Sequence, residues 1–150
     1  MPSRSLETPT GTFSLWEEDG AITRANWGPA EDAVSDLLDE AASQIEAYFN
    51  GTRTEFELPL KLKGSPLQQE VCKAMLAIPF GETRTYGDLA RDLGVPAQAI
   101  GQACGGNPIA LIIPCHRVLG AASLGGFSGK FGIETKVELL KHEGAASLLI

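Results

Sequence analysis

The sequence predicts an α/β protein in which short strands come first and helices dominate the rest. Apolar and polar residues alternate over residues 12–16 and 21–27, as they do in half-buried strands. Residues 31–49 carry one apolar stripe at helical spacing. The second half holds several short helical segments with clear start and stop signals. With 150 residues, the chain has the size of one domain, or of two small domains that share a core.

Composition excludes several classes of protein. Hydrophobic residues make up 43% and charged residues 21%, which is ordinary for a globular protein and too apolar for a disordered one. No apolar run approaches the roughly 20 residues that span a bilayer, and the polar start of the chain lacks a signal-peptide pattern. We therefore expect no membrane partner and a cytoplasmic location. The three cysteines have no C-x-x-C spacing and no zinc pattern with the two histidines, so we expect a reducing setting, no metal and no cofactor.

The net charge of −7 is unevenly distributed along the chain. Residues 1–63 carry 5 Lys and Arg against 12 Asp and Glu, whereas residues 64–150 carry 7 of each. A strongly acidic chain argues against non-specific binding of nucleic acid. The neutral second half weakens that objection, because a local basic face can still form there.

The first half indicates a hairpin, a long helix and a short strand. The Asp-Gly pair at residues 19–20 is a strong turn signal between the two strands. The helix over residues 31–49 stops at the Asn-Gly pair of residues 50–51. We expect a further short strand over residues 56–60. No catalytic pattern occurs in the first 63 residues.

Three short helices are expected next. Ser65 can cap the first of them, with Gln68 completing a capping box. The second begins after Thr85 and ends at Gly94, and the third covers residues 97–104. The last two are joined by a tight turn, which is typical of a helix-turn-helix.

The third of these helices is unusually rich in small residues. Small side chains let a backbone come close to another surface, which is either a neighbouring helix or a groove of a ligand. Cys72 and Cys104 fall on inner faces and are expected to be core residues. By helical spacing, Ala97, Ile100, Gly101 and Cys104 face the core, whereas Gln98, Gln102 and Gly105 face outward.

The strongest chemical signal is the Pro-Cys-His-Arg-Val string at residues 114–118. An apolar run over residues 109–113, expected to be a buried strand or an extended segment, leads into it. A thiol titrates near 8.5, so Cys115 needs a base, and His116 can take its proton directly or through one water. Neighbours on a strand point to opposite faces, so His116 requires an irregular backbone or a bridging water. Glu143, in a closing helix expected over residues 135–143, can orient that histidine.

The wider pattern resembles the O6-alkylguanine-DNA alkyltransferases, also called methylated-DNA–protein-cysteine methyltransferases. The resemblance covers roughly residues 65–146, and residues 1–63 match only in outline. It implies a small ribonuclease-H-like N-terminal domain, residues 1–63, packed on a mostly helical domain, residues 64–150, that contains the helix-turn-helix. It is carried by Asn107-Pro108, by Ile-Pro-Cys-His-Arg-Val-Leu-Gly at 113–120, by Gly-Phe-Ser-Gly at 126–129, by His-Glu-Gly at 142–144 and by Tyr86.

The resemblance implies direct-reversal DNA repair without a cofactor. Cys115 would take the alkyl group from O6-alkylguanine in one irreversible turnover, after the base is flipped out of duplex DNA. His116 would act as base through a water, and Glu143 would orient it. Asn107 would join the two halves of the site, and Tyr86 would turn a phosphate and protonate the departing base. The protein would be a monomer that binds the minor groove and is used at the nucleoid.

The resemblance also implies a set of substrate-binding residues. Ser128, flanked by Phe127 and Gly129, would hydrogen-bond the guanine, and the packing of this loop would set the width of the pocket. Ala99 and Gly101 would let their helix approach the minor groove. Arg117 would tie down the local backbone beside the substrate, or would be an ordinary ion-pair partner.

Two residues depart from the family pattern. Gln98 stands where the family usually has an arginine that fills the gap left by the flipped base. Glutamine is shorter and uncharged, so we predict weaker flipping and weaker DNA affinity. Ala110 stands where some relatives have proline, and we expect little effect of this change on the class of reaction.

Three other interpretations stay open at this stage. Alkyltransferase-like proteins bind alkylated DNA without transferring the group; they lack the cysteine that is present here as Cys115, but Gln98 keeps this alternative open. Cys115, His116 and Glu143 also have the residue types of a cysteine hydrolase, although no oxyanion-hole pattern stands out. The third is an interaction module with an inert thiol. The range of alkyl groups, the role of the acidic half and any regulatory role are not determined by the sequence.

Overall fold

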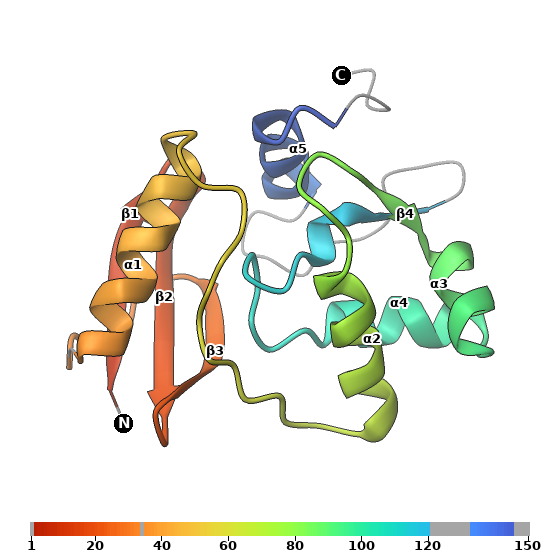
Figure 1. The fold of residues 1–150 in the computed structure, drawn as a ribbon, viewed down its shortest axis with the longest axis horizontal. Helices are drawn as coiled ribbons and strands as arrows, with labels where there is room; N and C mark the ends of the chain where they lie inside the picture. The colour runs from red at the N-terminus through yellow and green to blue at the C-terminus, as the bar shows by residue number, and fades with distance from the viewer. Residues whose placement is uncertain (1, 34, 121–132, 146–150) are drawn as a thin grey trace.

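The protein, described here from a computed structural model over residues 2–33, 35–120 and 133–145, has the expected mixed α/β fold. A three-stranded sheet with one helix on its face lies beside a cluster of short helices (Figure 1). One continuous set of buried apolar side chains runs through both parts. Among the described helices, none is both long and apolar enough to cross a membrane.

The N-terminal part is an antiparallel meander covered by a helix. Strands β1 (Ser3–Thr8), β2 (Gly11–Glu18) and β3 (Ala21–Trp27) pair in that order, and α1 (Asp36–Phe49) packs on β1 and β2. The predicted hairpin of β2 and β3 is confirmed. Strand β1 was not predicted, because Leu6 is its only large apolar residue and a single residue gives no alternation.

Two boundaries in this part differ from the prediction. Helix α1 begins at Asp36 rather than at residue 31, because the Ser35 side chain accepts a hydrogen bond from the Leu38 N–H at 3.2 Å and caps the helix there. Ala33, which precedes the helix, instead exchanges backbone hydrogen bonds with Ser3 of β1. The strand expected over residues 56–60 is absent, and only Leu60 forms an isolated bridge to Ile22.

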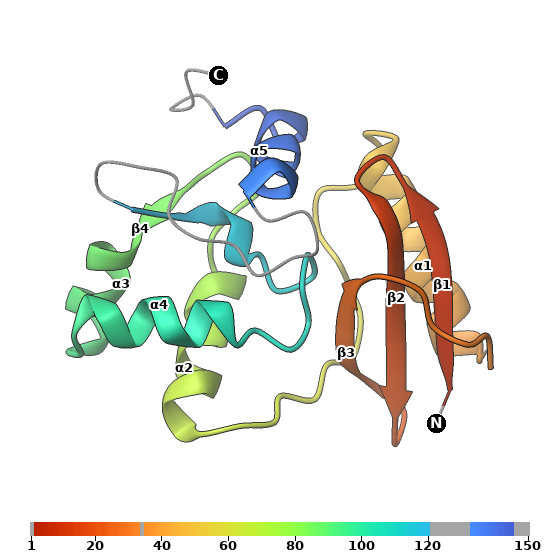
Figure 2. The same cartoon turned by 180° about the vertical axis from the view of Figure 1, so that it is seen from behind.

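The second part consists of short helices around a small parallel strand pair (Figure 2). Strands β4 and β5 pair in parallel, and α3 and α4 pack together as the expected helix-turn-helix. The elements are α2 (Pro66–Leu76), β4 (Arg84–Thr85), α3 (Tyr86–Leu93), α4 (Ala97–Gly105), the 3-10 helix η1 (Cys115–Arg117), β5 (Val118–Leu119) and α5 (Ile133–His142).

The predicted caps of these helices are largely confirmed. Ser65 caps α2, Thr85 and Asp88 form a capping box on α3, and Gly94 ends α3 in the left-handed conformation at φ 68°. Gln68 differs from the prediction, since it does not complete a capping box. Its side-chain amide donates instead to the Ala103 carbonyl at 2.8 Å and so ties α2 to α4.

The inner face of α4 is rotated slightly from the predicted one. Ile100 and Cys104 are buried as expected, and Ala103 is buried with them. Ala97 is exposed and Gly101 is half-buried. The predicted outward residues Gln98, Gln102 and Gly105 are exposed.

The apolar run over residues 109–113 is buried as expected, but it is a compact turn and not a strand. Leu111 adopts a left-handed φ of 68°, which a strand does not permit. The turn is fastened to the edge of β3, where the Ala25 N–H donates to the Pro108 carbonyl and the Ala110 N–H donates to the Ala25 carbonyl, both at 3.0 Å. A proline at position 110 could not make the second of these bonds. The edge of β3 therefore helps to position the chain that leads to Cys115.

Candidate active site

The site is built on η1, which follows Pro114 directly. The Cys115 N–H donates to the Ile113 carbonyl at 2.8 Å, and the Arg117 N–H donates to the Pro114 carbonyl at 3.0 Å. A 3-10 turn has three residues per turn, so consecutive side chains point in different directions. The side chains of Cys115, His116 and Arg117 therefore contact different parts of the protein, and all three residues are buried. This is the irregular backbone that His116 was predicted to need.

His116 is paired with Glu143, which comes directly after α5. The His116 Nε2 and Glu143 Oε2 atoms lie 2.7 Å apart, and both side chains are fully buried. Burial lowers the pKa of His116 below its usual value, more than the neighbouring carboxylate raises it. A neutral imidazole facing a carboxylate carries its proton on the facing nitrogen, here Nε2. The buried Nδ1, which has no hydrogen-bond partner among the described residues, is then the basic nitrogen.

Glu143 accepts hydrogen bonds from three side chains. Besides His116, the Arg117 guanidinium donates from Nε to Oε1 at 2.8 Å and from Nη2 to Oε2 at 2.9 Å. The Tyr48 hydroxyl, from α1 in the other part of the molecule, donates to Oε2 at 2.7 Å. Burial alone would raise the pKa of Glu143, but the bonds from His116 and Arg117 outweigh it and hold that pKa well below its usual range. The carboxylate is therefore charged and fixed in orientation.

Arg117 is an interior residue. Only 7% of its surface is exposed, and beyond Glu143 its Nη1 donates to the Ile78 carbonyl at 2.7 Å. Its bonds to a buried carboxylate and to a backbone carbonyl two residues after α2 agree with the ion-pair partner and the backbone tie that the sequence allowed.

Asn107 holds the turn that presents Cys115. Its side-chain amide donates to the Ile113 carbonyl at 2.8 Å, and its Oδ1 accepts from the Ile109 N–H at 3.1 Å. Cys115 is 5% exposed, and burial raises the pKa of its thiol, opposed by a hydrogen bond from Asn107 and by the charge of Lys136. The thiol is therefore protonated at rest and depends on a base for reactivity.

Lys136 was missed by the sequence analysis. It lies fully buried on α5, and its amine donates to the Val118 carbonyl at 2.7 Å. The amine is 5.8 Å from the ring centre of Tyr86, the first residue of α3. Burial lowers the pKa of Lys136 to about 8, opposed by the charges of Cys115 and Cys104. The signal for it was present, because Lys136 stands four residues before the buried Leu140 on the inner face of its helix.

Tyr86 lies half-buried beside Lys136, whereas Gln98, Ala99 and Gly101 lie on α4. Burial raises the pKa of Tyr86, so its hydroxyl keeps its proton at neutral pH. Among the described residues, no side-chain hydrogen bond or ion pair links Gln98, Ala99 or Gly101 to Cys115, His116 or Glu143. Phe127, Ser128 and Gly129 lie outside the described residues. Within the described ranges, no three His, Cys, Asp or Glu side chains are grouped to hold a metal ion.

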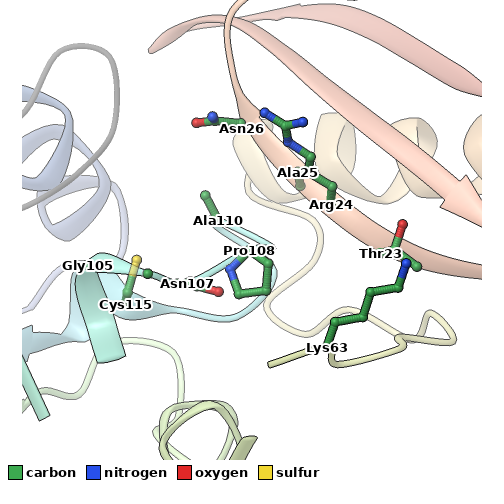
Figure 3. A pocket seen from close by; sticks show the side chains of 11 residues that line it. Thr23, Arg24, Ala25, Asn26, Lys63, Gly105, Asn107, Pro108, Ala110 and Cys115 are labelled. Carbon is green, nitrogen blue, oxygen red and sulfur yellow. The ribbon is translucent and has the colours of Figure 1, made fainter. Parts of the chain in front are cut away.

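Cys115 also borders a cavity of about 340 Å³ between β3 and the turn that follows α4 (Figure 3). The sulfur lies at one end of it, beside Asn107 and Gly105, and the side chains of β3 form the opposite wall. The thiol of Cys115 thus borders open space, and the next residue in the chain is the histidine that pairs with Glu143.

Comparison with known proteins covers nearly the whole chain. Residues 66–145 match the family described as "6-O-methylguanine DNA methyltransferase, DNA binding domain", and residues 3–62 match its "ribonuclease-like domain". A methylated-DNA–protein-cysteine methyltransferase of Mycobacterium tuberculosis is 42% identical, over 93% of this chain and 90% of the relative. The constitutive enzyme of that name from Bacillus subtilis is 40% identical over 93% of each chain.

Solved structures agree with this match. The crystal structure of Mycobacterium tuberculosis OGT in complex with DNA superposes with a TM-score of 0.86 at 39% identity, covering 95% of this chain and 93% of that chain. The crystal structure of the Mycobacterium tuberculosis O6-methylguanine methyltransferase gives a TM-score of 0.84 at 37% identity, covering 99% and 96%.

Proposed function

Since this chain belongs to the 6-O-methylguanine DNA methyltransferase family, we propose that Cys115 is the residue that receives the alkyl group from O6-alkylguanine. The protein is a methylated-DNA–protein-cysteine methyltransferase of direct-reversal DNA repair, and DNA is its partner. The observation that carries the role of Cys115 is its position on η1, next in the chain to a histidine that is hydrogen-bonded to a buried carboxylate.

The reaction begins with removal of the thiol proton. His116 takes it at Nδ1 through one water, while Glu143 holds the ring and stabilises the charge that forms on it. The positive charge of Lys136 favours the thiolate. The thiolate then attacks the alkyl carbon in line. The sulfur–carbon bond forms as the carbon–O6 bond breaks, and the electron pair of that bond stays on the guanine.

Tyr86 supplies a proton to the departing guanine. Its hydroxyl is protonated at neutral pH, which is the state a general acid needs. Asn107 keeps the turn before η1 in place through both of its amide atoms. A thioether does not leave again, so each protein molecule acts once.

The DNA is bound by α3 and α4. The exposed start of α4, where Gln98 is followed by the small residues Ala99 and Gly101, approaches the minor groove, and Gln98 fills the gap of the flipped base. Phe127, Ser128 and Gly129 contact the flipped guanine. The protein acts as a monomer in the cytoplasm, with residues 1–63 and 64–150 as its two domains.

The test is a duplex carrying one O6-methylguanine, followed by the intact mass of the protein and mapping of the modified peptide. We expect one methyl group on Cys115, saturating at one per protein. Cys115→Ala should remove the transfer, whereas Cys104→Ala, a second buried cysteine, should retain it. Binding of the lesion duplex without transfer by the unmodified protein would contradict the proposal and indicate a damage-binding protein.

A further inference from the structure

The cavity beside Cys115 has room for more than a methyl group. At about 340 Å³ it equals the liquid volume of roughly eleven waters at about 30 Å³ each. The wall next to the sulfur consists of small or compact residues, among them Gly105, Gly106 and Ala110. A Cβ atom built on Gly105 would meet nothing within 4 Å. Cys115 and residues of β3 border this same cavity, so the reacting sulfur and β3 face one common space.

The far wall of the cavity is polar and positively charged. It is formed by Thr23, Arg24 and Asn26 of β3 and by Lys63, and the side chains of Arg24 and Lys63 extend from that wall in Figure 3. None of the described residues that line the cavity is acidic. A substituent on a bound base that extends past Cys115 into the cavity would therefore meet hydrogen-bond donors and cations at its far end.

Of the two described cations that line the cavity, Arg24 is the one available to a ligand. The Lys63 amine is occupied by Glu18 at 2.5 Å, so its charge is largely balanced. Arg24 makes no ion pair among the described residues. Its guanidinium stacks over the Trp16 ring at 4.8 Å, which fixes the group while leaving its N–H donors for an acceptor.

We propose that this cavity receives O6 substituents longer than methyl that end in a carboxylate, and that Arg24 recognises the carboxylate. The inference rests on the proposed function and extends it to a substrate class. The transfer step itself is unchanged: the bond from sulfur to the first carbon forms, the bond from that carbon to O6 breaks, and the carboxylate takes no part. Arg24, on the domain without a catalytic motif, is then a specificity-determining residue.

The experiment compares single-turnover transfer from three duplexes, carrying O6-methylguanine, O6-butylguanine or O6-carboxypropylguanine. The last two have chains of equal length and differ in the charge of the end. The unmodified protein should transfer all three to Cys115, and carboxypropyl faster than butyl. Arg24→Gln should reduce the carboxypropyl rate about 3- to 10-fold, as expected for a partly exposed ion pair, and leave the other two within about 2-fold. Arg4→Gln, on β1 and outside the cavity, is the matched control and should change none of the rates.

The outcomes separate this inference from the function on which it rests. Transfer of methyl with no transfer of either longer group would overturn the inference alone. So would a carboxypropyl-to-butyl ratio that is the same in the unmodified protein and in Arg24→Gln. Absence of transfer from all three duplexes would overturn the proposed role of Cys115 as well.

Discussion

Replacing Tyr48 by phenylalanine removes one hydroxyl that links the N-terminal sheet domain to the carboxylate behind His116. The hydroxyl is buried and donates to Glu143 Oε2 at 2.7 Å. The Tyr48 ring packs on Phe49, Phe56, Phe80 and His142, with centroids 4.7 to 6.0 Å apart, and a phenylalanine ring keeps these contacts. The substitution therefore isolates the hydrogen bond.

The magnitude follows from what Glu143 retains. A hydrogen bond to a charged group contributes about 1.5–3 kcal/mol. After the substitution, Oε2 still accepts from His116 at 2.7 Å and from Arg117 at 2.9 Å, so no buried acceptor is left without a partner. We therefore expect Tyr48→Phe to lower the free energy of unfolding by about 1.5–2 kcal/mol, the lower end of that range. For a chain of this size, that is a fall in Tm of about 3–8 °C.

The assay is a double-mutant cycle of Tyr48→Phe and Glu143→Gln by urea unfolding, with Tyr48→Leu as the variant that also loses the ring contacts. We expect a coupling energy of about 1 kcal/mol or more between the two sites. Tyr48→Leu should be less stable than Tyr48→Phe by a further ~1 kcal/mol. Burial and Glu143 raise the pKa of Tyr48. The stabilisation by its hydroxyl is therefore complete below about pH 10 and falls progressively as the pH rises further. A coupling energy of zero would refute the claim that the hydroxyl stabilises the carboxylate.

Three further predictions concern the site. Gln98→Arg should raise the rate of transfer and the affinity for lesion duplex in single-turnover and binding assays; an unchanged or lower rate would contradict the assigned role of Gln98. Because burial lowers the pKa of His116, the imidazole stays neutral down to at least the ordinary histidine value near 6.5. The rate of transfer should therefore stay nearly constant from about pH 7.5 to about pH 6.5. A tenfold fall of the rate across that range would count against His116 as the base. Because the pKa of Glu143 is held low, its stabilisation is complete above about pH 4.3 and lost on further acidification, so urea unfolding of Glu143→Gln should depend less steeply on pH there.

Local signals in the sequence predicted much of the fold. The turn at residues 19–20, the caps Ser65 and Thr85 and the stop at Gly94 depend on contacts within a few residues, and all are observed. The errors arise where distant segments compete. Gln68 bonds to Ala103 instead of its own helix end, and residues 109–113 form a turn because β3 supplies their backbone partners.

The site was predictable where its residues are adjacent in sequence and less so where they meet only in space. Cys115 and His116 are neighbours, and Glu143 follows an amphipathic helix, so their types and spacing indicated a relay. Nothing in the sequence indicated Tyr48, because a tyrosine on the apolar stripe of a helix is indistinguishable from an ordinary core residue. Its hydroxyl donates to Glu143, which is 95 residues away in the sequence. The two residues meet only because the two domains pack together.

The N-terminal domain therefore supports the site although it carries no catalytic motif. It contributes the Tyr48 hydroxyl to Glu143, and the edge of β3 holds the turn before Cys115 through Ala25. Both contacts involve buried polar groups, which are costly to leave without partners. Separating the two domains would expose Glu143 to water and free the turn, so the thiol would lose both the fixed orientation of His116 and its own fixed position. The acidic surface of this domain carries no such constraint, and we expect substitutions on its solvent-exposed face to leave transfer of a methyl group unchanged.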